Sequence, residues 1–350
     1  MRPIKRILVV QTAFIGDVIL TLPLVQVLKE FIPQAEIDVV VVPRASEICR
    51  NNPSIARVIE YDKRGKDSGW RGFRRIVALV KERDYQIAIL PHRSLRSALT
   101  ALLAGIPLRV GFRKGGGRFL FNKSVPYDQE KHEVERNLSL LSAIGIRDLG
   151  KVLPLVYPSR SDQAAATKIL AGIPVKRRSN VIAVAPGTIW NTKRWLKERF
   201  VELIKMLHDD GFAVVLVGGK EDVDLCSSII VEADRKYVVN TAGSLTLLES
   251  AELMRRCRLT VSNDSAPMHL SVAVGTPVVA IFGATVPSFG FAPYGPHDAV
   301  VETRGLHCRP CSVHGGDECP IKTFECMVQI TPDRVFSRVM AVLEEVHAKN

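Results

Sequence analysis

The sequence predicts an α/β protein built from two doubly wound domains, each a parallel sheet covered by helices. Apolar runs of four to six residues, bounded by Gly, Pro and Asn, recur along the chain and are typical of strands that are buried on both faces. Helical patterns separate these runs, which indicates crossover connections between parallel strands. The chain has 350 residues, 47% of them hydrophobic, and this length favours two domains of ordinary size over one.

Each half of the chain contains five expected strands. They cover residues 7–10, 37–42, 58–61, 87–90 and 108–111 in the first half, and 181–185, 213–217, 238–241, 259–262 and 278–282 in the second. Helices are expected over residues 18–31, 97–103, 133–144, 197–209 and 247–257. The alternation therefore repeats once along the chain.

The expected domains are 1–170 and 171–331. Polar residues 157–163 and basic residues 176–178 bracket the expected linker. A last helix over 332–350 has no strand after it, and packing back on the N-terminal domain is one expectation for it. No charged side chain lies between Asp264 and Asp298, but glycines and prolines interrupt this stretch, so it does not read as a membrane span. The first apolar strand is too short for a secretory signal, which predicts a cytoplasmic protein.

All of the net charge of +12 lies in the first half of the chain. Residues 1–170 contain 28 Lys and Arg against 16 Asp and Glu, whereas residues 171–350 contain 20 of each. Such a field attracts polyanions over a Debye length of about 8 to 10 Å, so nucleic acid, an anionic bilayer and a phosphorylated glycolipid are candidate partners. A basic surface that serves only solubility is the alternative. Few aromatic side chains lie among these arginines to stack on bases, which argues against nucleic acid.

The first strand runs into the turn Gln11-Thr12-Ala13-Phe14-Ile15-Gly16-Asp17. A dinucleotide fingerprint needs three glycines here and only Gly16 is present, which argues against NAD or FAD. An acidic residue at a strand-to-helix turn lies at the carboxyl edge of the sheet, where open α/β sheets bind ligands. Asp17 is therefore a candidate general base, and a helix cap is the alternative.

The strand over 181–185 runs into Pro186-Gly187-Thr188 and then Asn191-Thr192-Lys193-Arg194-Trp195. Small residues let backbone N–H groups approach a ligand, while Lys193 offers a compact charge and Arg194 a planar fork for phosphate. We expect this turn to stabilise a phosphorylated leaving group, and a solvated basic turn is the alternative. Asp222 and Asp224 follow the next strand, but they fall in a first helical turn, where acidic residues are common. We interpret them as structural.

The most informative stretch covers residues 258–283. It reads as a strand, the polar turn Asn263-Asp264-Ser265, a helix with Pro267 in its first turn, and a second strand. The free N–H groups and partial positive charge of that helix end favour a diphosphate. Asp264, Ser265 and His269 add groups that can orient a polyhydroxy ligand. The pattern indicates a sugar-nucleotide site, and an ordinary βαβ unit with a capped helix is the alternative.

Four cysteines are concentrated late in the chain: Cys308, Cys311, Cys319 and Cys326. Their number matches a zinc site, but the later intervals of seven and six residues match no standard zinc finger. Disulfides are not expected in a reducing cytoplasm. The two expectations are reduced thiols that pack a loop and a structural zinc ion.

Taken together, the chain resembles the ADP-heptose:lipopolysaccharide heptosyltransferases of glycosyltransferase family 9, and among them those that add the second inner-core heptose. The resemblance covers nearly the full length. It rests on residues 9–18, His132-Glu133-Val134-Glu135-Arg136, Lys193-Arg194-Trp195, Gly218-Gly219, residues 262–269 and Phe282-Gly283. It implies a GT-B architecture: two facing Rossmann-like domains, with the acceptor on the first and the nucleotide sugar on the second.

The resemblance also implies the reaction. An inverting, metal-independent transferase without a cofactor would move L-glycero-D-manno-heptose from ADP-heptose to heptosyl-Kdo2-lipid A in the inner core of lipopolysaccharide. Another nucleotide sugar or acceptor in cell-surface polysaccharide synthesis is the alternative. A non-catalytic sugar-nucleotide sensor is a further one, although it has no use for Asp17.

The same resemblance implies the roles of individual residues. Asp17 would act as base and Lys193 would stabilise the departing ADP. Donor contacts would come from Gly16, Thr188, Lys193, Asp264, Ser265, Ala266, Met268, His269 and Gly283, and acceptor contacts from Arg64, Lys66, Arg113 and Lys114. The protein would be a monomer that works on the inner face of the inner membrane, with a glycolipid and no nucleic acid as partner.

Overall fold

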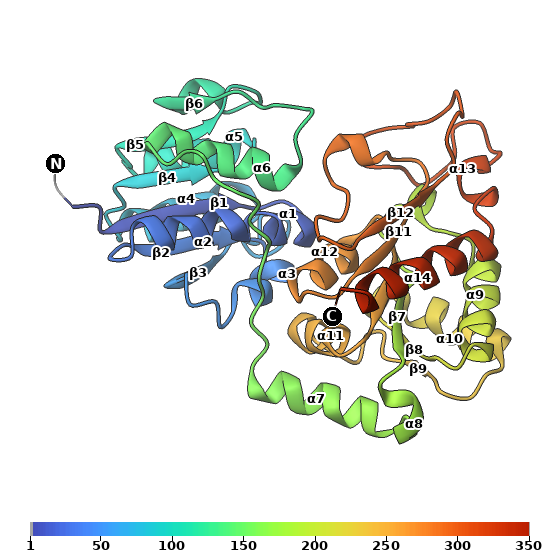
Figure 1. Ribbon diagram of the computed structural model, residues 1–350. Coiled ribbons are helices and arrows are strands. Elements are labelled where there is room, and N and C mark those ends of the chain that lie inside the picture. The colour runs from blue at the N-terminus through green and yellow to red at the C-terminus, as the bar shows by residue number, and fades with distance from the viewer. Residues whose placement is uncertain (1–2, 350) are drawn as a thin grey trace. The chain divides into compact units, whose positions relative to one another are not determined.

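The computed structural model describes residues 3–349. The chain divides into two compact units, Met1–Tyr157 and Pro158–Asn350, and each contains one six-stranded parallel sheet (Figure 1). The prediction of two parallel α/β sheets is confirmed.

The strand order in the first unit is β3-β2-β1-β4-β5-β6. The strands are β1 (Arg6–Gln11), β2 (Glu36–Val41), β3 (Arg57–Glu60), β4 (Ile87–Leu90), β5 (Leu108–Phe112) and β6 (Lys123–Val125). The apolar runs of β1 and β4 are fully buried at the centre of this sheet, which is why they lack the polar alternation of half-exposed strands.

Helices cover both faces of this sheet. They are α1 (Ile15–Ile19), α2 (Leu22–Phe31), α3 (Pro43–Ser46), α4 (Gly69–Lys81), α5 (Leu95–Leu103) and α6 (Glu133–Ser139). Helix α2 packs against α6, and α4 packs against α5. Because crossovers between parallel strands are right-handed and the strand order reverses at β1, the two pairs lie on opposite faces (Figure 1).

The second unit repeats the same topology, with the order β12-β11-β10-β7-β8-β9. Its strands are β7 (Val181–Ala185), β8 (Ala213–Leu216), β9 (Val238–Asn240), β10 (Leu259–Asn263), β11 (Val278–Phe282) and β12 (Ala299–Glu302). Its helices are α7 (Arg160–Ala171), α8 (Val175–Arg178), α9 (Lys197–Asp209), α10 (Val223–Ala233), α11 (Leu247–Arg255), α12 (Ala266–Ala273), α13 (Glu325–Val328) and α14 (Pro332–His347).

Both sheets have the doubly wound order 3-2-1-4-5-6 when the strands of each unit are counted from its start. The order reverses between β1 and β4 in the first unit and between β7 and β10 in the second. Ligands of open α/β sheets bind beyond the carboxyl ends of the strands at this reversal. The fold therefore places one candidate binding position in each unit.

The division of the chain differs from the expected boundary at residue 170. Helix α7 packs against α11, and the Arg256 Nη1 donates a hydrogen bond to the Thr167 hydroxyl at 2.7 Å. Helix α7 therefore belongs to the second unit. The C-terminal helix α14 packs against α9 and the strands β10 to β12, so it completes the second unit as well and does not belong to the N-terminal one.

The sequence did not predict strands β6 and β12, a break in one helix, or several helices, among them α4 and α7. Strands β6 and β12 are short edge strands with partly exposed residues, so they lack a continuous apolar run. The expected helix over 18–31 is two helices, and Pro23, which has no N–H to donate, lies in the first turn of α2. No helix of the part of the chain described is long and apolar enough to cross a membrane.

Candidate active site

Polar residues from two neighbouring strands meet at the reversal point of the first unit. Thr12 and Asp17 follow β1, and His92 and Arg93 follow β4. The Thr12 hydroxyl lies 2.9 Å from the His92 Nδ1, and the Lys63 ammonium donates to the Thr12 carbonyl oxygen. Burial, with the charges of Lys63 and Arg93, lowers the pKa of His92 to about 4, so this imidazole is neutral near pH 7.

Asp17 lies in the first turn of α1, next to Gly16, and its side chain is partly exposed. The Phe14 N–H donates to the Asp17 Oδ2 at 3.2 Å, so the carboxylate does cap the helix. Burial among neighbouring atoms, followed by the charge of Glu133, nevertheless raises the pKa of Asp17 to about 6. A carboxylate with this pKa is ionised at neutral pH and is a stronger base than an ordinary aspartate. Asp17 can therefore cap the start of α1 and also act as a base.

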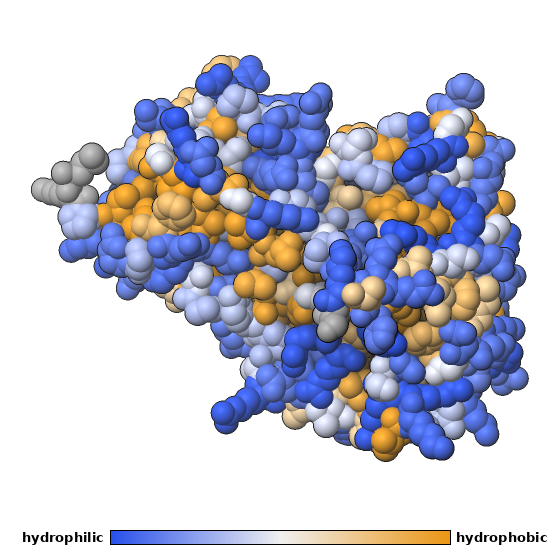
Figure 2. All heavy atoms as spheres, in the orientation of Figure 1, coloured by the Kyte–Doolittle hydropathy of each residue, from blue (hydrophilic) through white to orange (hydrophobic). Residues whose placement is uncertain are grey.

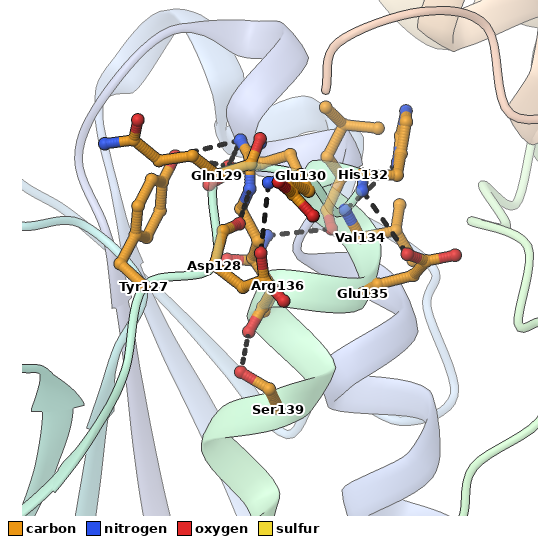
Figure 3. Close-up of polar contacts among 12 residues, drawn as sticks. Tyr127, Asp128, Gln129, Glu130, His132, Val134, Glu135, Arg136 and Ser139 are labelled. Carbon is orange, nitrogen blue, oxygen red and sulfur yellow. Dashed lines mark hydrogen bonds and ion pairs between the residues drawn. The ribbon is translucent and has the colours of Figure 1, made fainter. Parts of the chain in front are cut away.

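A buried polar cluster supports this site from the side of α6 (Figure 3). Glu133 accepts hydrogen bonds from the Tyr127 hydroxyl at 2.9 Å and from the Arg136 Nη1 at 3.1 Å. Arg136 also donates to the carbonyl oxygens of Asp128 and Gln129, both at 2.6 Å, and ties the loop before α6 to the helix. Burial raises the pKa of Glu133 in spite of these bonds.

The residues of the His132 to Arg136 motif thus have two different tasks. His132 is the N-cap of α6: its Nδ1 accepts from the Val134 N–H, while the Glu135 carboxylate accepts from the His132 N–H (Figure 3). Glu133 and Arg136 point inward, and both side chains are nearly inaccessible. The motif therefore builds a helix start that holds a negative charge near Asp17.

The four expected acceptor-binding residues are all exposed. Arg64 and Lys66 follow β3, and Arg113 and Lys114 follow β5. Because all strands of the sheet are parallel, these residues share the carboxyl edge with Asp17. The Lys114 ammonium lies 5.8 Å from the centre of the Tyr127 ring, and the Arg93 guanidinium lies 4.1 Å from it. Positive charge thus surrounds the Asp17 end of this unit.

In the second unit, the turn after β7 is held close to the end of β8. A Cβ atom on Gly187 would lie 2.0 Å from the Asp222 Oδ1, so the Asp222 side chain occupies the space that a larger residue would need. Asp222 accepts from the Gly219 N–H at 2.9 Å, which agrees with a structural role for it. The Arg194 Nη2 donates to the Thr188 carbonyl oxygen at 2.8 Å, so this arginine shapes the turn.

Lys193 and Asp264, which the sequence suggested for two different tasks, form an ion pair. The Lys193 Nζ lies 2.7 Å from the Asp264 Oδ2, and both side chains are largely buried. The Thr285 hydroxyl donates to the same carboxylate oxygen at 2.6 Å. The pair joins the turn after β7 to the turn after β10, on the two sides of the reversal point.

The start of α12 holds the other expected donor contacts. Ser265 is the N-cap residue, and its side chain makes no capping bond. Ala266 opens the helix, and His269 is buried within it. Met268 is a correction, because its side chain is fully inaccessible and its N–H is bonded to the Ser265 carbonyl oxygen. The start of α12 can therefore offer a ligand Ser265 and the amide of Ala266, but no group of Met268.

Close packing explains why residue 283 is a glycine. A Cβ on this residue would lie 2.4 Å from the Met327 Cε, and the Gly283 carbonyl oxygen accepts from the Arg309 Nε at 2.5 Å. Both partners belong to the cysteine-rich segment, residues 303–327.

Within residues 3–349, no three His, Cys, Asp or Glu side chains are grouped as a metal site requires. Cys326 nevertheless lies close enough to Cys308, Cys311 and Cys319 for their charges to raise its pKa, so zinc binding by these four thiols stays a prediction.

The cysteine-rich segment also contacts the Lys193 turn, which the sequence did not indicate. The Thr192 N–H donates to the Gly316 carbonyl oxygen at 3.0 Å, and the Gly316 N–H donates to the Thr192 hydroxyl at 2.8 Å. Gly315 has a φ of +85°, and a Cβ on it would lie 2.9 Å from the Lys193 Cγ. This two-bond contact, the Thr192–Gly316 clasp, holds the backbone that carries Lys193.

Other residues of the two regions were also missed. Thr285, Tyr127 and His92 bear no recognisable motif, and only their position after a strand connects them with the site. The glycine pair at 315–316 was the one available signal for the clasp.

The comparisons with known proteins concern the family and the fold. Lipooligosaccharide heptosyltransferase 2 of Haemophilus ducreyi is 28% identical, over 97% of this chain and 99% of that protein. The structure of E. coli ADP-heptose lipopolysaccharide heptosyltransferase II has a TM-score of 0.80 at 26% identity, covering 98% and 99%. A family 9 glycosyltransferase of Veillonella parvula shares the fold, with a TM-score of 0.87 at 24% identity, covering 97% and 98%. The model of glycosyltransferase family 9 (heptosyltransferase) matches residues 73–321, and the chain belongs to this family.

Proposed function

We propose that this glycosyltransferase moves a heptose from ADP-heptose to the inner core of lipopolysaccharide, with heptosyl-Kdo2-lipid A as acceptor. The observation that carries the proposal is the carboxylate of Asp17, whose pKa is raised to about 6 at the reversal point of the first sheet. Membership of a heptosyltransferase family and the basic charge around Asp17 support the choice of a heptose donor and a phosphorylated acceptor.

In the proposed reaction, an acceptor hydroxyl oxygen attacks the anomeric carbon of the donor heptose. The new C–O bond forms while the bond from that carbon to the diphosphate breaks, and ADP leaves with the electron pair. Asp17 takes the hydroxyl proton. A single displacement of this kind inverts the configuration at the anomeric carbon.

The second unit would bind the leaving group. Lys193 neutralises charge that develops on the diphosphate, and Thr188 and the amide at the start of α12 add hydrogen bonds. Asp264 holds hydroxyl groups of the heptose once Lys193 has turned to the phosphate. The proposal requires no metal ion or cofactor, since these groups supply the compensating charge.

The proposed acceptor is a glycolipid, so the enzyme would work on the cytoplasmic face of the inner membrane, and we propose that it does so as a monomer. Arg64, Lys66, Arg113 and Lys114 are exposed at the edge of the sheet that carries Asp17 and would bind the acceptor phosphates. Arginine and lysine are suited to this role, as a fork and a point charge respectively.

The test is a transfer assay with purified full-length protein, ADP-heptose and heptosyl-Kdo2-lipid A. We expect release of ADP, a product heavier by one heptose, and an inverted anomeric configuration by NMR. ADP-glucose, UDP-sugars and GDP-sugars serve as competing donors in parallel reactions. Transfer from one of these in the absence of transfer from ADP-heptose would overturn the proposal and favour a different sugar nucleotide.

A further inference from the structure

The first unit carries a surface of exposed aromatic and apolar side chains mixed with arginines, separate from the residues described above. Trp70 at the start of α4 is 66% exposed, and Phe119, in the turn after β5, is 80% exposed. We call this the α4–α5 surface. Its members are Trp70, Arg71, Arg74, Leu95, Arg118 and Phe119.

Direct contacts connect these residues into one surface. The Arg96 Nη2 donates to the Gly69 carbonyl oxygen at 2.8 Å, which ties the first turn of α5 to the start of α4 beside Trp70. On the other side of α5, a Cβ on Gly117 would lie 2.5 Å from the Ala98 Cβ, so the turn that leads to Phe119 lies against this helix. Trp70 and Phe119 therefore flank the first turn of α5.

The same part of the chain is strongly basic. No Asp or Glu occurs between Asp84 and Asp128, whereas this stretch contains seven Lys and Arg. In α4, Arg71 and Arg74 are exposed, and the nearby Asp67 is buried and bonded to Arg75 at 2.6 Å. The Arg118 guanidinium lies 4.2 Å from the centre of the Phe119 ring. Phe119 thus has a cation beside its ring, and Trp70 is followed in α4 by the exposed Arg71 and Arg74.

Aromatic side chains with adjacent cations suit the boundary between a bilayer and water, where the ring enters the headgroup region and the cation meets lipid phosphate. We propose that the α4–α5 surface docks on an anionic phospholipid bilayer. This inference rests on the proposed function, because a glycolipid acceptor is the reason for the enzyme to bind a membrane. It specifies which face of the first unit meets the lipid.

The surface is also continuous with the Asp17 site. A Cβ on Gly115 would lie 2.7 Å from the Arg93 Cβ, and the Arg93 guanidinium lies 4.1 Å from the centre of the Tyr127 ring, which borders Glu133. Arg113 and Lys114 stand in the same turn. A glycolipid headgroup beside the docked surface would thus meet the residues that we assign to the acceptor.

The test is co-sedimentation of the full-length protein with vesicles of phosphatidylcholine alone and with equimolar phosphatidylglycerol. We expect binding to the anionic vesicles that falls with salt, and a loss of affinity of about tenfold or more in the double variant Trp70→Ala/Phe119→Ala. Arg71→Glu/Arg74→Glu should also weaken it. Phe31→Ala is the matched control, because Phe31 is an exposed aromatic residue at the end of α2, on the opposite face of the sheet.

Two further measurements separate this inference from the proposed function. Brominated lipid should quench the fluorescence of the wild-type protein but quench Trp70→Phe much less. Transfer to a deacylated, water-soluble acceptor should be the same in Trp70→Ala/Phe119→Ala as in the wild type, whereas transfer to acceptor in vesicles should fall. Vesicle binding that equals the wild type in the aromatic double variant would overturn the docking surface and leave the transferase proposal intact. Binding without transfer in either assay would overturn the transferase proposal only.

Discussion

The ammonium group of Lys193 and the carboxylate of Asp264 lie 2.7 Å apart and are largely buried in the second unit. Lys193 stands in the turn after β7 and Asp264 in the turn after β10, so the pair spans the reversal point of the sheet. A diphosphate that binds Lys193 competes with Asp264 for the same cation. We therefore expect the pair to lower the affinity of the second unit for ADP.

Replacing Asp264 by Asn should strengthen ADP binding. The substitution removes the charge that competes for Lys193, and since even an exposed ion pair is worth up to about 1 kcal/mol, we expect an effect of about fivefold or more in Kd. Titration calorimetry with ADP measures the effect. Transfer of heptose should fall in the same variant, because Asp264 is also assigned to the sugar, and an unchanged ADP affinity would show that the pair does not limit nucleotide binding.

Lys193→Ala should weaken ADP binding by about tenfold or more, because the compact charge for the diphosphate is lost. Lys197→Ala is the matched control: Lys197 is nearby at the start of α9, and its ammonium pairs with Glu232. Since Asp264 loses its partner in the first variant, Lys193→Ala/Asp264→Asn is measured as well. Wild-type affinity for ADP in both variants would remove Lys193 from the phosphate site.

Gly315→Ala should displace Lys193, because Gly315 contacts the Lys193 side chain and adjoins the Thr192–Gly316 clasp. Gly315 has a φ of +85°, and the added methyl group would lie 2.9 Å from the Lys193 Cγ. We expect weaker ADP binding, by roughly threefold to tenfold, measured by calorimetry. Gly305→Ala is the control, because Gly305 has a φ of +80° with nothing within 4 Å of the added Cβ. An equal effect of both substitutions would assign the loss to backbone strain alone.

Asp17→Asn should lower kcat by about 10² or more while ADP binding persists. In the wild type, kcat/KM should rise with pH through about 6, the pKa of Asp17, and this limb should vanish in the variant. Near-normal turnover would remove Asp17 from the mechanism.

The same substitution should change stability in a pH-dependent way. Since the pKa of Asp17 rises from 3.8 to about 6 on folding, the folded state binds the proton more tightly, and stability is lost as the pH rises through this window. An asparagine side chain does not ionise, so the variant does not lose this stability as the pH rises. Asp17→Asn should therefore be more stable than the wild type near pH 7, by at most about 3 kcal/mol, and equal to it well below pH 4. Thermal unfolding at both pH values checks the sign.

Transfer activity should survive EDTA, because the proposed mechanism neutralises the diphosphate with Lys193, Thr188 and the start of α12. An assay with and without the chelator, followed by magnesium, measures this. Loss of activity that magnesium restores would point instead to a metal-bound nucleotide and direct attention to Asp222 and Asp224.

Local residue patterns predicted most of the strands and the strand-to-helix turns that carry the candidate site residues. The strand over 181–185 and the helix over 197–209 have the expected bounds, because burial on both faces and helical periodicity leave local patterns. Asp17 and Asp264 lie at the carboxyl ends of β1 and β10 for the same local reason.

Which of these residues contact each other depends on the packing of distant segments. It pairs Lys193 with Asp264, brings Gly316 to Thr192 from 124 positions away, and sets Glu133 near enough to Asp17 to raise its pKa. It also buries Met268, which the sequence placed among the donor contacts. Such contacts depend on strand order and on loops that cross the sheet edge. A local pattern of residue types does not encode them, because the same pattern fits many pairings of distant segments.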